Sequence, residues 1–370
     1  MKIIIVFGTR PEAIKMAPVI KELRKFPGEM DCKVCVSAQH RQMLDPFLKN
    51  FKIKPDYDLN IMQKNQSLEY IIHTVLGGLR KIILKEQPDY ILVQGDTTTA
   101  MAAALAAYYH HVKIAHIEAG LRTYDKNRPF PEEANRQFID DISDLFFVHT
   151  KEARDNLLKE GKPANKIHLT GNTVIDAVLE VAQRCENIGS PVHIEKAGKS
   201  GKKIILVTAH RRENWGRPLE QICLAVKKIA LKYPAEVEII YPVHLNPAVK
   251  EMVYKTLRGI KNVHLIAPLD YFSFIHLMKS SYMILSDSGG VQEEAPSLHK
   301  PVLVLRDVTE RPEALKAGAT KMVGTDIKRI VDAASRLIEN KKAYQKMAQV
   351  RNPYGDGKAS QRIVSRLLKE

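Results

Sequence analysis

Short apolar runs alternate with amphipathic segments along almost the whole of this chain. The runs are rich in Ile, Val and Leu, and the segments between them repeat apolar residues at helical spacing. Because a helix that joins two such strands places them side by side in parallel, this order predicts parallel sheets with helices on both faces. The expected strands are Lys2–Phe7, Lys33–Ser37, Tyr90–Val93, Lys113–Ile117, Leu145–Val148, Lys166–Leu169, Lys203–Val207, Val237–Ile240, Val263–Ile266, Tyr282–Leu285 and Val302–Leu305. The expected helices include Pro11–Lys25, Leu68–Lys85, Thr98–Tyr109 and Pro218–Lys232.

The alternation is interrupted between residues 165 and 200 by a polar, glycine-containing segment, after which the strand–helix order restarts. A length of 370 residues also suits two domains. The sequence therefore predicts an α/β fold of two doubly wound parallel-sheet domains, residues 1–169 and 170–354. A further amphipathic helix is expected within residues 355–370.

Charge and hydropathy narrow the choice of partner. The apolar run Ile3–Phe7 is shorter than the roughly 7–15 residues of a signal peptide core. The longest uncharged stretch, Thr97–Tyr109, is shorter than the roughly 20 residues of a membrane span. We expect a cytoplasmic protein with no membrane partner. The net charge of +15 comes from scattered basic pairs, which favours a solvated surface over a nucleic-acid site and suits a polyanionic small substrate.

Cys32 and Cys35 form the most metal-like spacing in the sequence. Residues three apart on a strand point to opposite faces, so these two thiols cannot easily share a metal. No second pair with this spacing exists. We expect buried structural thiols, and neither a metal nor a cofactor.

Polar residues follow the first expected strand. Gly8 permits a tight turn, and Pro11 suits the first position of a helix. Arg10 and Lys15 could meet an anion at that helix start, which a plain capped turn would not require. The segment is neither a dinucleotide-binding glycine motif nor a P-loop, so the dehydrogenase and NTPase classes lose support.

Three carboxylates, Asp96, Glu118 and Glu132, fall at successive strand or helix ends of the first domain. Alone, Asp96 is more simply an N-cap, and Glu132 compensates a helix dipole. Together they suit acid–base chemistry, because clustered carboxylates push their pKa values apart.

The second domain repeats the pattern. His210, Arg211 and Arg212 follow a strand, and three such side chains together favour an anion site. Further along, Ser288-Gly289-Gly290 precedes an expected helix over Val291–Ser297, whose start offers free N–H groups to a diphosphate. A carboxylate one turn later could take ribose hydroxyls. Arg311 follows the next strand.

Taken in order, these motifs resemble those of the non-hydrolysing UDP-N-acetylglucosamine 2-epimerases. The resemblance extends from residue 3 to about residue 357 and includes GTRPEAIK at the first turn and HIEAGLR at the end of the fourth expected strand. The matching segments are Gly8–Lys15, Gln39–Gln42, Gln94–Thr97, His116–Arg122, Pro131–Glu133, His210–Asn214, Asp287–Pro296 and Arg306–Glu313.

The resemblance implies a GT-B architecture, in which two Rossmann-like domains surround a central cleft and the C-terminal helix packs back on the first domain. It also implies a homodimer that acts on UDP-GlcNAc and UDP-ManNAc without a cofactor. By resemblance, Asp96, Glu118 and Glu132 face the sugar and are, together with His210, the catalytic residues. Ser288, Gly289 and Gly290 hold the diphosphate together with Arg10 and His210. Glu294 binds the ribose, Phe274 lies near the uracil, and Lys15 and Arg311 also bind the substrate.

The expected reaction is inversion at C2 of the sugar. Because the C2 proton is not next to a carbonyl, elimination of UDP to a 2-acetamidoglucal and re-addition is the favoured route. Which carboxylate is the acid and which the base stays open. So do three alternatives: a hydrolysing epimerase that releases UDP and ManNAc, a retaining glycosyltransferase, and a non-catalytic sugar-nucleotide sensor.

Some members of the family carry a second, activating substrate site. The matching positions here are Gln39, His40, Gln42, Arg211 and His244. Asn65 stands where regulated members have an Arg, which leaves such activation open in this chain.

Overall fold

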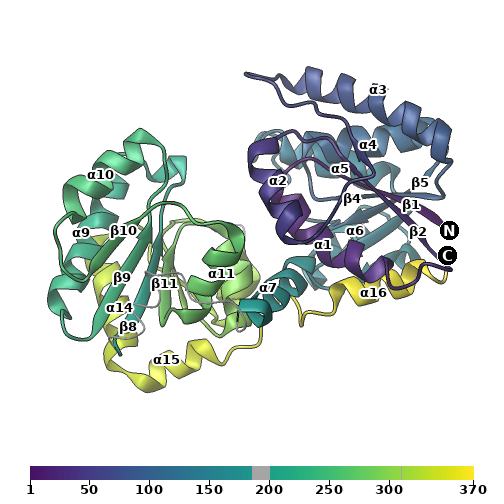
Figure 1. Ribbon diagram of the computed structural model, residues 1–370. Helices are drawn as coiled ribbons and strands as arrows, with labels where there is room; N and C mark the ends of the chain where they lie inside the picture. The colour runs from purple at the N-terminus through teal and green to yellow at the C-terminus, as the bar shows by residue number, and fades with distance from the viewer. Residues whose placement is uncertain (186–200, 310) are drawn as a thin grey trace. The chain divides into compact units, whose positions relative to one another are not determined.

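A computed structural model describes residues 1–185, 201–309 and 311–370 of the protein. The chain forms two compact units, Met1–Ala177 together with Gly355–Glu370, and Val178–Tyr354. The first boundary falls inside helix α7 (Thr173–Arg184), a little later than the expected residue 169. Figure 1 shows both units, each with a sheet between helices.

In the described chain, the first unit holds a seven-stranded sheet whose neighbouring strands all pair in parallel. Across the sheet the strands are β3 (Tyr57–Asp58), β2 (Asp31–Val36), β1 (Lys2–Phe7), β4 (Tyr90–Gln94), β5 (Lys113–Ile117), β6 (Leu145–Val148) and β7 (Ile167–Leu169). Besides α7, its helices are α1 (Arg10–Leu23), α2 (Arg41–Asn50), α3 (Leu68–Glu86), α4 (Thr98–Tyr109), α5 (Glu132–Ile142), α6 (Lys151–Lys159) and α16 (Ala359–Leu367). Helix α16, at the yellow end of the chain in Figure 1, packs against α1.

The second unit repeats this design with six parallel strands among its described residues. In order they are β10 (Val263–Ile266), β9 (Val237–Pro242), β8 (Lys203–Thr208), β11 (Met283–Ser286), β12 (Val302–Val304) and β13 (Thr320–Met322). The helices are α9 (Arg217–Lys232), α10 (Pro247–Leu257), α11 (Tyr271–Ser280), α12 (Gly289–Glu294), α13 (Pro312–Ala317), α14 (Ile327–Glu339) and α15 (Lys341–Ala348).

The strands form because their side chains are buried on both faces of each sheet. All residues of Ile3–Phe7 are fully buried, as are those of Ile91–Val93 and Ile205–Val207. Such continuous apolar runs are typical of parallel strands covered by helices on both sides. Helix α4 packs closely against α3 and α5, since the alanines along it are buried and leave little bulk between the helices. The predicted fold class, two doubly wound parallel-sheet domains, is confirmed.

Some details differ from the sequence prediction. The structure adds β3 and β13, because two or three residues are too few to show a strand pattern. The helix expected over Val291–Ser297 begins at Gly289 and ends in a 3₁₀ turn, Ala295–Leu298. The thiol of Cys35 is buried as expected, but Cys32 is only partly buried, at the more exposed start of its strand.

Each strand order reverses its direction at one place. In the first unit the chain goes outward from β1 toward β3 and then from β4 toward β7, so the switch lies between β1 and β4. In the second unit it lies between β8 and β11. Ligands of such sheets bind beyond the carboxyl ends of the strands at this switch. Gly8 and Asp96 follow the first pair of strands, and His210 and Ser288 follow the second.

No helix among the described residues combines the length and apolar character needed to cross a membrane.

Candidate active site

The turn after β1 is fixed by a buried carboxylate. Glu12 in the first turn of α1 accepts hydrogen bonds from the backbone N–H groups of Gly8 and Thr9, at 3.1 and 2.8 Å. Its carboxylate also accepts from the hydroxyl groups of Thr9 and Thr97, each at 2.7 Å. Burial raises the pKa of Glu12, while these hydrogen bonds oppose the rise. Glu12 therefore joins the turn after β1 to the start of α4.

Gly8 lies where a side chain has no room. A Cβ at this position would lie 2.1 Å from Ser37 Oγ and 2.7 Å from Thr99 Oγ1, two hydroxyl groups that hydrogen-bond each other. We expect Gly8→Ala to destabilise the first unit by about 1–3 kcal/mol through overpacking. Gly77→Ala, on an exposed helix position with free space, is the control and should stabilise by about 0.5–1 kcal/mol. Urea unfolding followed by circular dichroism checks both, and equal stabilities of the two variants would contradict the packing argument.

Asp96, directly after Gly95 at the end of β4, is partly buried and paired. Arg136 Nη2 on α5 donates to Asp96 Oδ2 at 2.5 Å, and Asn135 Nδ2 donates to the Asp96 main-chain oxygen at 2.9 Å. Burial raises the pKa of Asp96 against the opposing Arg136 cation. The neighbouring Glu118 charge adds to this rise, and Lys15 opposes it. A carboxylate with a raised pKa keeps its proton to higher pH than an exposed one, which suits acid–base chemistry.

Glu118 follows β5, the strand next to β4 in the sheet. It forms a close ion pair with Lys15 of α1, and Gln94 Nε2 donates to the same carboxylate oxygen at 2.8 Å. Its backbone φ is 71°, an uncommon value for a residue with a side chain. The predicted residues Asp96, Glu118 and Lys15 are thus brought together. Arg136 and Gln94 were not predicted as site residues, although Gln94 begins a matching segment, because each meets its partner only through the folded sheet.

Glu132 differs from the other two carboxylates. It is half-buried at the first position of α5, and no hydrogen bond or ion pair to it occurs within the described residues. Because positions three and four apart on a helix share a face, it lies on the same side as Asn135 and Arg136, which hold Asp96. Its neighbour Glu133 is fully buried instead, and accepts from the N–H groups of Thr123 and Tyr124, each at 3.0 Å.

In the second unit, Asp287 organises the segment after β8. Its Oδ2 accepts from the N–H groups of His210 and Arg211, each at 2.8 Å, and from Asn214 Nδ2 at 3.0 Å. The Asp287 side chain is fully buried, and its Oδ1 lies 3.8 Å from His210 Nδ1. Asp287 thereby ties the end of β11 to the His210 turn across the switch point.

The ring of His210 stacks on that of His244, with centroids 5.2 Å apart and planes 4° from parallel. Burial lowers the pKa of His210 below its ordinary value of 6.5, and the Asp287 carboxylate opposes this. The nearby His244 and Arg211 add to the lowering. His210, predicted as a catalytic residue, is therefore in contact with His244, which was predicted to belong to the second, activating substrate site.

The Ser288–Gly290 turn opens α12. The predicted free amides are only partly available, since the Ser288 N–H donates to Ser286 Oγ at 3.0 Å. The guanidinium groups of Arg211 and Arg311 both come within 3.9 Å of the place where a Gly289 Cβ would stand. Two cations thus lie beside the start of α12, which makes this end of the second sheet suitable for a polyanion.

The remaining residues predicted to contact the nucleotide lie on α11 and α12 or pair with a residue of α12. Arg311 forms a close ion pair with the buried Glu293. Tyr271 Oη donates to Glu294 at 3.0 Å, so this predicted ribose ligand has a fixed place. Phe274 is half-buried on α11, the helix that carries Tyr271.

Arg10 has an unusual environment at the start of α1. Its Nε is buried and has no hydrogen-bond partner among the described residues. A buried donor without an acceptor is costly in a folded protein and is often satisfied by a ligand. This agrees with an anion-binding role for Arg10.

The residues expected for a second substrate site are divided between the two units. In the first unit, Gln39 accepts from Thr99 Oγ1 at 3.1 Å, and its main-chain oxygen accepts from Gln66 Nε2 at 3.0 Å, whereas His40 and Gln42 are exposed. Arg211 and His244 are exposed in the second unit. Asn65 adopts φ of 56° in the loop before Gln66.

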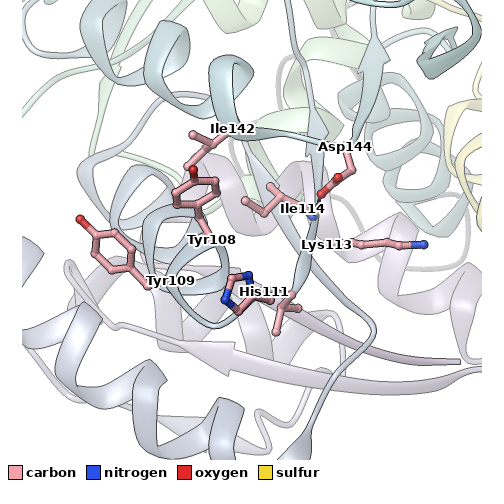
Figure 2. A pocket seen from close by; sticks show the side chains of 8 residues that line it. Tyr108, Tyr109, His111, Lys113, Ile114, Ile142 and Asp144 are labelled. Atoms are coloured by element: carbon pink, nitrogen blue, oxygen red, sulfur yellow. Dashed lines mark hydrogen bonds between the residues drawn. The ribbon is translucent and has the colours of Figure 1, made fainter.

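A pocket of about 440 Å³ lies elsewhere, near the amino ends of β5 and β6 (Figure 2). Tyr108, Tyr109, Lys113 and Asp144 are among the residues that line it. Asp96 and Glu118, which were predicted to be catalytic, follow the carboxyl ends of β4 and β5, so this pocket belongs to the opposite edge of the first sheet. Within the described part of the chain, no group of three or more His, Cys, Asp or Glu residues could hold a metal ion.

Two Rossmann-like units with charged switch points define a GT-B-like α/β protein. Comparison with known families gives a match of residues 21–368 to the UDP-N-acetylglucosamine 2-epimerase family. The chain is 51% identical over 372 residues to the UDP-N-acetylglucosamine 2-epimerase of Yersinia pestis, covering 99% of this chain and 98% of that protein. The chain belongs to the UDP-N-acetylglucosamine 2-epimerase family, which confirms the resemblance seen in the motifs.

Solved structures agree with this assignment. The UDP-GlcNAc 2-epimerase of Neisseria meningitidis, bound to UDP-GlcNAc, is 49% identical and superposes with a TM-score of 0.89 over 100% of both chains. The Methanocaldococcus jannaschii UDP-GlcNAc 2-epimerase, in complex with UDP-GlcNAc and UDP, is 36% identical with a TM-score of 0.81, again over 100% of both chains.

Proposed function

We propose that the protein interconverts UDP-GlcNAc and UDP-ManNAc and keeps the sugar on the nucleotide at the end of each turnover. The observation that carries this proposal is the pair of partly buried carboxylates, Asp96 and Glu118, at neighbouring strand ends, each beside a cation. Membership of the family and the UDP-GlcNAc bound in the Neisseria meningitidis relative support the substrate.

The proposed chemistry is elimination followed by addition. A carboxylate takes the C2 proton, the C1–O bond to UDP breaks, and a C1=C2 double bond forms. UDP then adds back at C1, and a proton is delivered to the other face of C2. Inversion requires acid–base groups on two faces of the sugar, or one group that moves, and Asp96 and Glu118 are the two that we propose. Glu132 is the third candidate, since its carboxylate is unpaired among the described residues.

The leaving diphosphate needs stabilisation where its charge develops. We propose that the second unit supplies it through the Ser288–Gly290 turn and the two guanidinium groups beside Gly289. His210 and Arg10 complete the proposed set, with Glu294 on the ribose and Phe274 near the uracil. This places Arg211 at the diphosphate, in addition to the activating-site role that the resemblance implies.

The proposed place of His210 gives a prediction for pH dependence. In the free protein burial lowers the pKa of His210 below 6.5, so the ring is neutral at pH 7. A bound diphosphate favours the imidazolium and raises that pKa, so binding takes up a proton. Affinity for UDP-GlcNAc should therefore rise as pH falls from 8 to 6, by at most about tenfold per pH unit.

Calorimetric titration of UDP-GlcNAc into the Asp96→Asn variant, in which turnover should be blocked, measures this dependence. The double variant Asp96→Asn/His210→Asn is the control and should lose the slope. An equal slope with and without His210 would show that another group takes up the proton.

We also propose a homodimer, as the family resemblance implies. Tyr108 and Tyr109 on α4 and Phe138 on α5 are large apolar side chains that are 55%, 64% and 61% exposed. Exposed aromatic side chains are enriched at protein interfaces. Light scattering after gel filtration measures the oligomeric state, and a monomer at micromolar concentration would overturn this point.

Product analysis separates the proposed reaction from its closest alternative. Incubation of the purified protein with UDP-GlcNAc alone should give a mixture with UDP-ManNAc, without accumulation of UDP. Equal amounts of UDP and free ManNAc would instead identify a hydrolysing epimerase. UDP-GlcNAc that binds but stays unchanged would point to a sensor or to a transferase that awaits an acceptor.

A further inference from the structure

A histidine of the first unit makes two hydrogen bonds in the sheet interior. His116 lies on β5, next to the carboxylate-bearing end of that strand, and its side chain is fully buried. Its Nδ1 is 2.6 Å from Asp140 Oδ1 of α5, and its Nε2 is 2.8 Å from the main-chain oxygen of Gly95. Gly95 immediately precedes Asp96, so one ring joins helix α5 to the backbone that carries a proposed acid–base group.

Asp140 extends the same network to the second carboxylate. Its Oδ2 accepts a hydrogen bond from the Gly120 N–H at 3.1 Å and forms an ion pair with Arg122 Nη2 at 2.7 Å. Both contacts hold the turn that begins at Glu118 and includes two residues with positive φ, Glu118 at 71° and Gly120 at 79°. Asp140 is fully buried, and the Arg122 side chain is only 1% exposed.

The hydrogen-bond partners of the His116 ring determine which of its nitrogens carry protons. The Gly95 oxygen can only accept, so Nε2 must carry a proton. The other partner, Asp140, already faces the Arg122 cation and the Gly120 N–H through its second oxygen. Although burial raises the pKa of Asp140, His116 and Arg122 together hold it below its ordinary value. An ionised carboxylate can only accept, so Nδ1 carries a proton as well.

We propose that His116 is a positioning residue: as a buried imidazolium it holds the Gly95 carbonyl and so fixes the place of Asp96. Its counter-ion Asp140 fixes the Glu118 turn from the same point. The network thus sets the separation of two carboxylates that must reach opposite faces of one carbon. This inference rests on the proposed function only for the roles of the carboxylates that His116 positions. The charge of the ring does not depend on that function.

The alternative is a purely structural ion pair, which would stabilise the unit without affecting where Asp96 lies. Two substitutions separate these ideas. In His116→Gln the amide nitrogen can occupy the place of Nε2 and keep the hydrogen bond to Gly95, but loses that to Asp140. In His116→Asn the amide nitrogen takes the place of Nδ1, so it keeps the hydrogen bond to Asp140 and loses the one to Gly95. Both variants remove the same cation beside the same carboxylate.

Steady-state kinetics with UDP-GlcNAc provides the first readout. We expect His116→Gln to keep kcat within about tenfold of wild type, and His116→Asn to lose about a hundredfold in kcat with little change in KM, because misplacement of a catalytic group by about 1 Å costs this much. Thermal unfolding should show similar losses for both. Equal kcat values for the two variants, or a lower kcat for the Gln variant, would overturn the proposal.

The second readout does not depend on turnover. In a ¹⁵N-histidine sample, a long-range ¹H–¹⁵N spectrum shows which ring nitrogens carry protons, and the spectrum of His116→Gln identifies the signals of His116. We expect both nitrogens of His116 to be protonated at neutral pH. One unprotonated nitrogen would overturn the inference even in an active enzyme. A wild-type protein that leaves UDP-GlcNAc unchanged would reject the proposed function, while this spectrum would still decide the charge of the ring.

Discussion

Replacing Asp96 with Asn is expected to lower kcat for epimerisation by about 10²–10⁴-fold, the usual contribution of a positioned acid–base group. The amide has nearly the same shape and can still accept from Arg136, so the change removes proton transfer and the negative charge but keeps this hydrogen bond. Glu118→Gln is expected to give a loss of similar size, since Glu118 is the second acid–base group that we propose. The initial rate of UDP-ManNAc formation, followed by NMR, measures both effects.

Two controls keep this result specific. Asp155→Asn changes an exposed carboxylate of the same unit, on α6, and should leave kcat unchanged. UDP affinity of the Asp96 variant should stay within about threefold of wild type, because the proposed diphosphate contacts belong mainly to the second unit. A variant without the Asp96 carboxylate that turns over at more than about a tenth of the wild-type rate would remove this residue from the chemistry.

Replacing Asp287 with Ala is expected to have the largest effect on the second unit. The substitution removes the acceptor of three hydrogen bonds, from His210 N, Arg211 N and Asn214 Nδ2. Buried donors without partners cost about 1–3 kcal/mol each, and two of these three are partly exposed. We therefore expect a loss of roughly 2–5 kcal/mol in the free energy of unfolding. UDP affinity should fall by more than about tenfold as the His210 turn loses its fixed conformation.

Trp215 makes this test direct. It is the single tryptophan of the chain, and its indole N–H donates to the main-chain oxygen of His210 at 3.2 Å. Its fluorescence during urea unfolding therefore reports on the turn that Asp287 holds. Asp287→Asn is the matched control, because its amide oxygen can accept the same hydrogen bonds, and it should keep most of the stability. An Ala variant as stable as the Asn variant would show that these hydrogen bonds contribute little.

The fold could be predicted from sequence because its signal is local. Strands buried on both faces are apolar over most of their length, and β1 and β6 have the predicted bounds for this reason. The predicted ends of helices also agreed with the observed ones in places, since α4 begins and ends at the predicted residues. The short strand β3 pairs through two residues only, and so few residues show no periodic pattern.

The site was predictable only as a set of strand ends. Parallel strands bring their carboxyl ends to one edge, which is why Asp96 and Glu118 could be grouped without coordinates, whereas Lys15 was predicted to meet an anion and not Glu118. The residues that pair with them could not be predicted, because each pairing depends on where the helices lie across the sheet. Arg136 is 40 residues from Asp96, and Asp140 is 24 residues from His116. A useful signal was present, however: a polar residue inside an apolar strand, such as His116 in β5, must find a buried partner.

The central claim is that carboxylates of the first unit exchange the C2 proton while UDP leaves and returns. Proton NMR of the purified enzyme with UDP-GlcNAc in D₂O, without added cofactor, tests it most directly. We predict that UDP-ManNAc appears with deuterium at C2, that the UDP-GlcNAc pool gains deuterium at the same position, and that UDP does not accumulate. UDP-ManNAc that retains protium at C2 would contradict the account, because the proton would then never have reached a solvent-exchanging carboxylate.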